Sequence, residues 1–260
     1  MEYAVTNTEI PAAEAAAQAH VYSATNALRY ATFGDLDGGL DQPITGSLER
    51  LVNAVPLAMT AALQKTVFYF VPLALTAQGE AEEPEQRKSS PVFVTRAYSA
   101  ALADRAICHR NVKLPDHEAV FLSARLHPDS FALAFELFIN VAHAVVEVTG
   151  VPETFGNLAW SQAVASARGE TSYDAFESRE KAQRNNTVDE KAKTDFLEAA
   201  FVDAIAVYML SLYLDFDYAD LKEREYPLLA PKELAGRLRA VNTLFPPNAG
   251  YEFAIKYRRR

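Results

Sequence analysis

The sequence predicts a predominantly helical α+β fold with a small mixed sheet. Two long apolar stretches, at 131–149 and 196–214, have the length and the terminal signals of helices. Shorter runs rich in β-branched and aromatic residues, at 66–75, 91–98 and 118–126, precede both stretches and indicate strands. The chain has 260 residues, of which 50% are hydrophobic and 23% are charged. This size and composition are typical of a globular chain with a substantial core.

The first part of the chain is predicted to be helical, with a loop between two helices. Residues 11–31 are rich in alanine and Pro11 stands where a helix can begin, so we expect a helix there. Residues 33–46 are dense in glycine and aspartate and predict a loop. Ser47 is expected to cap a second helical stretch, which Pro56 must break or restart.

The three strand candidates lie on both sides of a polar segment. Pro72 either places the first strand, 66–75, at the edge of a sheet or ends it early, because proline cannot donate a ladder hydrogen bond. Residues 78–90 are polar, charged and contain proline, which predicts a surface loop, a hairpin excursion or a boundary. The second and third strands are expected at 91–98 and 118–126.

The remainder of the chain is predicted to be mainly helical. Asp129 or Ser130 can cap the helix that begins at Phe131, and Gly150 with Pro152 ends that helix. Further helical segments are expected as a short helix at 157–167, a charged and solvated helix-loop segment at 177–195, and an amphipathic helix at 231–245 that begins at Pro231.

Charge and hydropathy argue against nucleic-acid partners and membrane insertion. The formal net charge is -9, whereas a nucleic-acid binder needs a basic surface. The N-terminus lacks the positive and apolar regions of a secretory signal. Charged or polar residues or proline interrupt the longest apolar tracts, 66–77 and 131–146, so we expect no membrane span and a cytoplasmic location. The basic end "KYRRR" is expected to be a solvated terminus.

Several residue types that often carry chemistry have an ordinary interpretation here. Cys108 is the only cysteine, so no intramolecular disulfide can form, and it is expected to be a small buried apolar side chain. The cluster of acidic residues Asp215, Asp217 and Asp220 lacks the glycine and the spacing of a calcium loop. Surface or capping roles are expected for four histidines: His20, His109, His117 and His127.

A polar stripe interrupts the apolar stretch "FELFINVAHAVVEVTG". Its members are Glu136, Asn140, His143 and Glu147, which on a helix fall within about 60° of one another. His143 and Glu147 are four residues apart, the spacing at which two side chains on one helix can bind one metal ion. The stripe is also compatible with an exposed strip of a core helix, or with an internal hydrogen-bond network in which Glu147 bonds to His143, and the pair spacing alone does not outweigh these structural interpretations.

The order of these elements resembles the core of the zincin metallopeptidases. In that family a strand and a short turn precede a helix carrying His-Glu-x-x-His, as 118–126 here precedes "VAHAVVEVTG". An edge strand precedes the active-site helix in these enzymes. The segment "FVDAIAVY", 201–208, looks like the family's later glutamate helix, and "LERLVNAVPLAMTAAL" looks like its opening helix. The resemblance covers roughly residues 45–215 and implies a single domain over 1–260, with an N-terminal helical segment 1–46 and a C-terminal helical extension 216–260.

The resemblance also shows which catalytic groups are changed. His143 matches the first zinc-binding histidine, Ala144 stands where the general-base glutamate belongs, and Glu147 replaces the second histidine. Ala199 occupies the position of the third ligand, although Glu198 and Asp195 lie close by. The implied metal ligands are therefore His143, Glu147, Glu198 and Asp195, for zinc or another divalent ion. The cleft that the resemblance implies would be lined by Glu136, Asn140, Ala144, Asp203 and Tyr208.

Loss of the glutamate predicts a severe loss of catalysis. Zinc activates its bound water, but a neighbouring base must take the proton, and such general acid–base help is worth about 10²–10⁴-fold. We therefore expect a catalytically impaired zincin-like protein that binds a peptide or a protein partner in the inherited cleft. The alternatives are a metal-dependent hydrolase with a non-standard His/Glu site, and a helical scaffold or interaction protein without a metal site.

Overall fold

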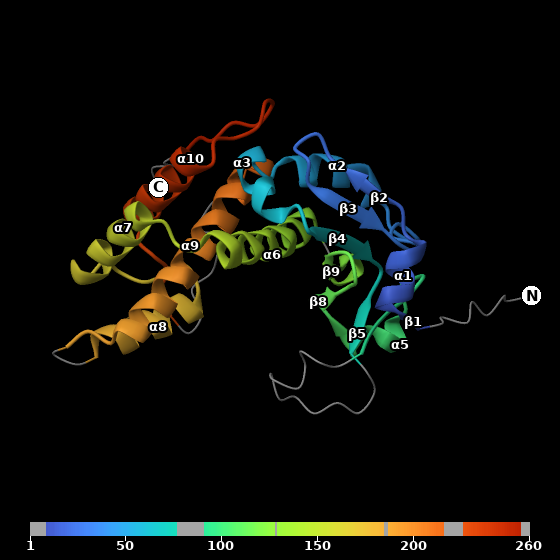
Figure 1. Cartoon of the computed structure of the whole chain (residues 1–260), viewed down its shortest axis with the longest axis horizontal. Helices are drawn as coiled ribbons and strands as arrows, with labels where there is room; N and C mark the ends of the chain where they lie inside the picture. The colour runs from blue at the N-terminus through green and yellow to red at the C-terminus, as the bar shows by residue number, and fades with distance from the viewer. Residues whose placement is uncertain (1–8, 77–90, 128, 185–186, 216–225, 256–260) are drawn as a thin grey trace, which may run out of the picture. The chain divides into compact units, whose positions relative to one another are not determined.

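The computed structural model describes residues 9–76, 91–127, 129–184, 187–215 and 226–255 (Figure 1). These residues form helices and two sheets, and the helices contain more residues than the strands. The predicted mixture of helices and strands, with more helix than strand, is therefore confirmed, whereas the strands form two sheets and not the one small sheet that the sequence predicts. The predictions for 78–90, for Asp217 and Asp220, and for the basic end 256–260 lie outside the described residues.

The chain divides into two compact units. Unit 1 comprises Met1–Asn53 and Leu63–Leu137, and unit 2 comprises Ala54–Ala62 and Phe138–Arg260. The boundary between them falls inside the long helix α6, Ser130–Thr149. The sequence predicts a single domain, and nothing in its composition marks a boundary within this apolar helix.

Unit 1 contains a five-stranded sheet. Its strand order is β2-β3-β4-β9-β8, with β3, β4 and β9 parallel and with antiparallel strands at both edges. The strands are β2 Val21–Ser23, β3 Arg29–Thr32, β4 Thr66–Val71, β8 His109–Lys113 and β9 Glu118–Ser123. Every residue of β4 is buried, because this central strand is covered on both faces.

Pro72 ends β4 immediately after Val71. The prediction that this proline shortens the strand is confirmed, whereas the alternative that it places the strand at a sheet edge is wrong, because β4 lies between β3 and β9. After the proline the chain enters a second sheet of order β1-β6-β5-β7. Its strands are β1 Ile10–Pro11, β5 Ala74–Thr76, β6 Val92–Val94 and β7 Ala106–Ile107.

The short helix α1, Ala12–Gln18, lies against β1 and β6 (Figure 1). Its buried alanines belong to the core that these strands share. The same core contains Val67, Tyr69 and Phe121 from the five-stranded sheet and Val94 from the four-stranded one. Alanine at three buried positions of α1 lets the helix approach the strands closely, which explains why this segment is rich in alanine. A further short helix, α5 Ala100–Ala103, precedes β7.

The predicted helix over 11–31 is wrong beyond Gln18. Residues 21–32 form the antiparallel pair β2 and β3 instead. The side chain of Asn26 fixes their connection, since it donates to the carbonyl of Val52 at 2.8 Å and accepts from the amide of Leu28 at 3.0 Å. Ala27 has a φ of 67°, a conformation that no helix contains. These tertiary contacts override the helix propensity of the alanines.

The second helical stretch is interrupted as predicted, although its start differs. Helix α2 spans Thr45–Asn53, so Ser47 lies inside it and is not its cap. Pro56 precedes the short helix α3, Leu57–Thr60, which continues as the 3₁₀ turn Ala61–Leu63. The break at Pro56 is therefore confirmed.

Helix α6, which carries the polar stripe, and the strand β9 before it form close to their expected bounds. Strand β9 ends at Ser123 and continues as the 3₁₀ turn Ala124–Leu126. Asp129 caps α6, because its carboxylate accepts from the amide of Ala132 at 2.8 Å. The resemblance implies an edge strand before this helix, and that expectation is wrong, because β9 lies between β8 and β4 and the edge strand is β8.

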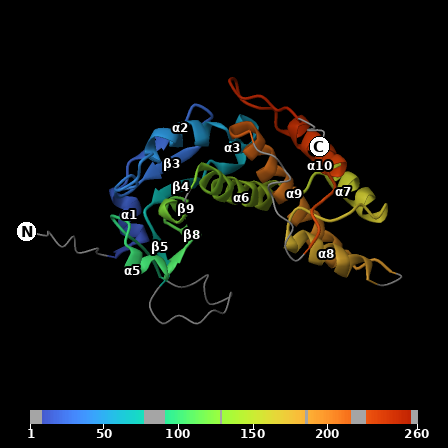
Figure 2. The same cartoon turned by 180° about the vertical axis from the view of Figure 1, so that it is seen from behind.

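The helices of unit 2 pack around α9, Glu190–Tyr213, which contacts α7, α8 and α10 (Figure 2). These are α7 Glu153–Val164, α8 Tyr173–Gln183 and α10 Pro231–Leu244, the last beginning at the predicted proline. From Phe201 to Leu210 only Asp203 of α9 is not classed as buried. The charged segment 177–195 supplies the end of α8 and the first turns of α9, as expected.

Among the residues that the structure describes, two helices are long and apolar enough to cross a membrane by length and composition alone. They are α6 and α9, and 50% and 72% of their most apolar windows are buried inside the structure. Such burial also occurs in the core helices of globular proteins, so the expectation of no membrane span stays a prediction.

Candidate functional site

The four residues of the polar stripe differ in their exposure along α6. Asn140 is buried at 5% exposure, Glu136 is partly buried, and His143 and Glu147 are exposed. Within unit 1, Glu136 contacts the Nδ1 atom of His109 at 2.6 Å. The stripe is therefore neither a uniform solvent strip nor a uniformly buried network.

The predicted residues on α9 fall into two groups. Asp195 and Glu198 are exposed near the start of the helix. Asp203 accepts a hydrogen bond from the Oγ1 hydroxyl of Thr171 at 2.7 Å. The Tyr208 hydroxyl donates to the carbonyl oxygen of Phe245 at 2.8 Å and lies 3.1 Å from Oδ1 of Asn242. Asp203 and Tyr208 thus make internal contacts of unit 2.

One group in the described part of the chain has the spacing of metal ligands. It consists of Cys108, His127 and Glu136, each with one ligand atom within 4.8 Å of the others. None of the four predicted ligands, listed above as His143, Glu147, Glu198 and Asp195, belongs to it. Their role as metal ligands stays a prediction without geometric support.

The expected burial of Cys108 is wrong, because its side chain is exposed. The residue is the one-residue connection between β7 of the four-stranded sheet and β8 of the five-stranded sheet. Partial burial, with a smaller contribution from the Glu136 charge, still raises the pKa of the Cys108 thiol. Burial also lowers the pKa of His127.

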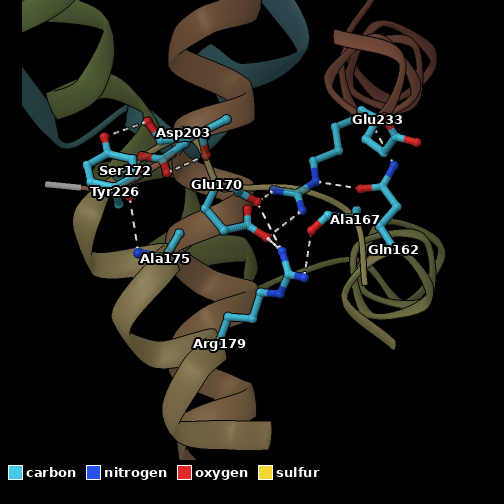
Figure 3. Close-up of polar contacts among 12 residues, drawn as sticks. Gln162, Ala167, Glu170, Ser172, Ala175, Arg179, Asp203, Tyr226 and Glu233 are labelled. Atoms are coloured by element: carbon cyan, nitrogen blue, oxygen red, sulfur yellow. Dashed lines mark hydrogen bonds and ion pairs between the residues drawn. The ribbon is translucent and has the colours of Figure 1, made fainter. Parts of the chain in front are cut away.

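A buried carboxylate in unit 2 was not anticipated from the sequence. Glu170 and Arg237 are both fully buried, and they form two parallel hydrogen bonds of 2.7 and 3.2 Å (Figure 3). The Nε atom of Arg237 donates to Gln162 at 2.8 Å. Such a bidentate pair is the strong form of a charge-assisted hydrogen bond.

A second guanidinium completes this network. Arg179 of α8 donates to Glu170 at 3.1 Å and to the carbonyls of Gly169 and Ala167 at 3.0 and 2.7 Å (Figure 3). The backbone of Glu170 also bonds to the segment before α10, accepting from the amide of Leu229 at 3.0 Å. The network therefore joins the α7–α8 connection to α8 and α10.

Asp203 lies in the same part of unit 2 and has a shifted acidity (Figure 3). Burial raises its pKa from 3.8 to about 6, and hydrogen bonds from Ser172 and Thr171 and the charge of Arg237 oppose that rise. A raised pKa is a common property of catalytic carboxyls, but it also occurs wherever a structural carboxyl is desolvated. The bond from Thr171 favours the structural role.

The sequence offered only a weak signal for this network. Glu170 follows Gly169 in a connection where a solvated acid is the ordinary expectation, and the two arginines lie 9 and 67 residues further along the chain. Arg237 occurs within an amphipathic helix, where a charged residue is expected on the exposed face. Its full burial depends on a partner that local periodicity does not reveal.

Comparison with known proteins identifies neither the Cys108, His127 and Glu136 group nor the Glu170 network. The chain matches no protein-family model, no curated protein and no solved structure. The function must therefore be argued from the residues and their contacts alone.

Proposed function

We propose that the chain is a zincin-like protein without peptidase activity, which binds a peptide or a protein partner. The proposal is supported by the order of the elements, since β9, a short turn and α6 follow one another and the apolar helix α9 comes later. The observation that carries it is Ala144, which stands between His143 and Glu147 on α6 where the resemblance requires a general base. A methyl group cannot accept or return a proton.

Two other titratable residues of the implied cleft, Asp203 and Tyr208, do not replace that base. Asp203 is bonded to Thr171, and the Tyr208 hydroxyl is bonded to the carbonyl of Phe245. Burial raises the pKa of Tyr208, so its hydroxyl keeps its proton at neutral pH. Both groups are committed to the packing of unit 2.

A peptidase assay tests the absence of activity. Wild-type protein loaded with zinc should hydrolyse a mixed library of quenched fluorescent peptides no faster than a His143→Ala variant. Hydrolysis that a chelator abolishes and that His143→Ala also abolishes would contradict the proposal and favour a hydrolase with a non-standard site.

A restoring substitution tests the ancestry. In a Cys108→Ser background, Glu147→His should create a His pair four residues apart on α6 and raise zinc affinity at least about tenfold. Ala144→Glu alone should not raise zinc affinity, because it supplies a base and no ligand. A folded Glu147→His protein with unchanged zinc affinity would count against the zincin resemblance.

Partner binding is tested separately by panning a peptide display library against the full chain. Enriched peptides should lose affinity when His143 and Glu147 are both replaced by alanine, and should keep it in a His20→Ala control. Enrichment of no peptide, or equal loss in the control, would remove this part of the proposal.

A further inference from the structure

Cys108, His127 and Glu136 come from three different segments of unit 1. Cys108 lies between β7 and β8, His127 follows the turn after β9, and Glu136 lies in the second turn of α6. One donor atom from each lies within 4.8 Å of the other two. Three segments therefore bring a thiol, an imidazole and a carboxylate to one point.

The backbone around Cys108 is held in place by Ser123, the last residue of β9. The amide of Ser123 donates to the carbonyl of Cys108 at 2.9 Å, and its hydroxyl donates to the carbonyl of Ile107 at 2.5 Å. The hydroxyl of Ser123 in turn accepts from the amide of Ala74 at 2.7 Å. The thiol is consequently carried on a fixed part of the sheet and not on a free loop.

His127 has a buried nitrogen that is not satisfied by the described residues. Its Nε2 atom is shielded from solvent and makes no hydrogen bond there. Burying a polar group without a hydrogen-bond partner is unfavourable, so such an atom in a folded protein calls for an explanation. The ring of His127 contributes one nitrogen to the group, and a neutral imidazole nitrogen is a good metal ligand.

His109 is suited to orient the carboxylate. Its Nδ1 atom lies 2.6 Å from Oε1 of Glu136, so the ring contacts the carboxylate that contributes an oxygen to the group. Metal-binding carboxylates are commonly held by such a second partner, which fixes their orientation.

We propose that unit 1 binds one zinc ion through Cys108, His127 and Glu136, with His109 as the residue that positions Glu136. A thiolate, an imidazole and a carboxylate form a donor set that zinc accepts in tetrahedral sites. With zinc–ligand bonds of about 2.0–2.3 Å, the donor atoms must lie roughly 3.3–3.8 Å apart, so small side-chain rotations close the site. The fourth position is left for water. This set shares none of the ligands that the zincin resemblance implies.

The ion would connect the β7–β8 turn, the end of the β9 segment and the start of α6. A ligand that binds only the folded state stabilises it in proportion to its concentration and affinity. Zinc should therefore raise the thermal unfolding midpoint of the wild-type chain and leave that of a ligand-deficient variant unchanged.

Cobalt substitution tests the site directly. The reduced full-length chain should bind one equivalent of Co²⁺ and develop thiolate-to-cobalt charge-transfer absorption in the near ultraviolet. Because Cys108 is the only cysteine, that absorption can come from no other residue. Cys108→Ser should abolish the absorption, and His127→Leu and Glu136→Gln should each weaken Co²⁺ binding at least about tenfold.

The matched control is the double variant His143→Ala, Glu147→Gln, which should keep the wild-type absorption and affinity. His109→Gln should weaken binding less than loss of a ligand while preserving the charge-transfer band. The inference is overturned if the wild-type chain takes up no stoichiometric metal or if bound Co²⁺ shows no thiolate absorption. It is equally overturned if binding is lost in the control double variant and retained in His127→Leu and Glu136→Gln.

Discussion

At the scale of the residue, the charge of Glu170 is required by its two partners. Arg179 and Arg237 both direct guanidinium groups at it, and Glu170 and Arg237 are fully buried. Isolated buried charges are far more costly than paired ones. The carboxylate thus makes the burial of the two arginines possible, and its role is to hold unit 2 together.

Glu170→Gln keeps the shape of the side chain and removes its charge. We expect the free energy of unfolding to fall by about 3–5 kcal/mol, because two guanidinium groups lose their counter-charge in a buried position. The control is Glu177→Gln, which breaks an exposed pair with Lys181 and should change stability by less than about 0.5 kcal/mol. Urea unfolding of both variants measures the difference, and equal effects would show that the buried network contributes little.

Titration of Asp203 should make the free energy of unfolding depend on pH. Its pKa is raised in the folded state to about 6 from 3.8, so between these values the folded state binds more protons than the unfolded state. Stability should consequently fall as pH rises from about 4 to 6, with a total contribution of roughly 3 kcal/mol. Asp203→Asn, which can still accept from Thr171, should remove this slope.

The control for that measurement is Asp195→Asn, an exposed acid on the same helix. It should retain the wild-type slope in urea unfolding measured at several values between pH 4 and 7. An Asp203→Asn protein with the same slope as wild type would show that Asp203 does not titrate in this range.

The sequence revealed the residues of the polar stripe. It did not reveal the buried network around Glu170 or the group of Cys108, His127 and Glu136, called here the cysteine group. Glu136 and His143 are visible because one helical period relates them. Cys108, His127 and Glu136 are separated by 19 and 9 positions and lie on three segments, so no local period connects them. Only the pairing of β8 with β9 and the turn that follows bring them together.

At the scale of the element, a single glycine sets the path between α7 and α8. Gly169 has a φ of +72°, and a Cβ atom there would lie 2.2 Å from the carbonyl oxygen of Leu228. Gly150, after α6, has a φ of +67° but has no other atom near its Cβ position. Substitution at Gly150 therefore tests backbone strain alone, whereas substitution at Gly169 tests backbone strain together with a steric clash.

Gly150→Ala should cost about 1–2 kcal/mol, the ordinary penalty for a side chain in the left-handed region. Gly169→Ala should cost more than this, because the methyl group also collides with a backbone carbonyl and displaces the segment that Glu170 anchors. Thermal unfolding followed by circular dichroism compares the two variants. Equal losses of stability in the two variants would mean that residues 227–228 can move away from the added methyl group without a free-energy penalty.

The elements that the sequence predicted well are those with strong local signals. Helix α6 has a cap at Asp129 and ends before Gly150, and proline marks both the break after α2 and the end of β4. The β2–β3 pair was missed because alanine content suggested a helix, whereas Asn26 and its contact with Val52 decide the local fold. Long-range contacts of this kind are absent from any local pattern.

At the scale of the whole molecule, the chain comprises two compact units, and its candidate features are distributed between them. The cysteine group belongs to unit 1, and the buried carboxylate network belongs to unit 2. The predicted ligands His143, Glu147, Asp195 and Glu198 also belong to unit 2. A metal ion located in the molecule would therefore identify which unit carries the chemistry.

The most direct measurement is an anomalous-scattering map at the zinc absorption edge, from crystals of the zinc-loaded full-length chain. We expect one peak in unit 1, within bonding distance of the Cys108 thiolate, His127 and Glu136, and no peak at His143 and Glu147. A peak held by His143 and Glu147, with none at Cys108, would contradict the new metal site and favour a hydrolase with a non-standard site. A map without any peak would contradict the metal site alone.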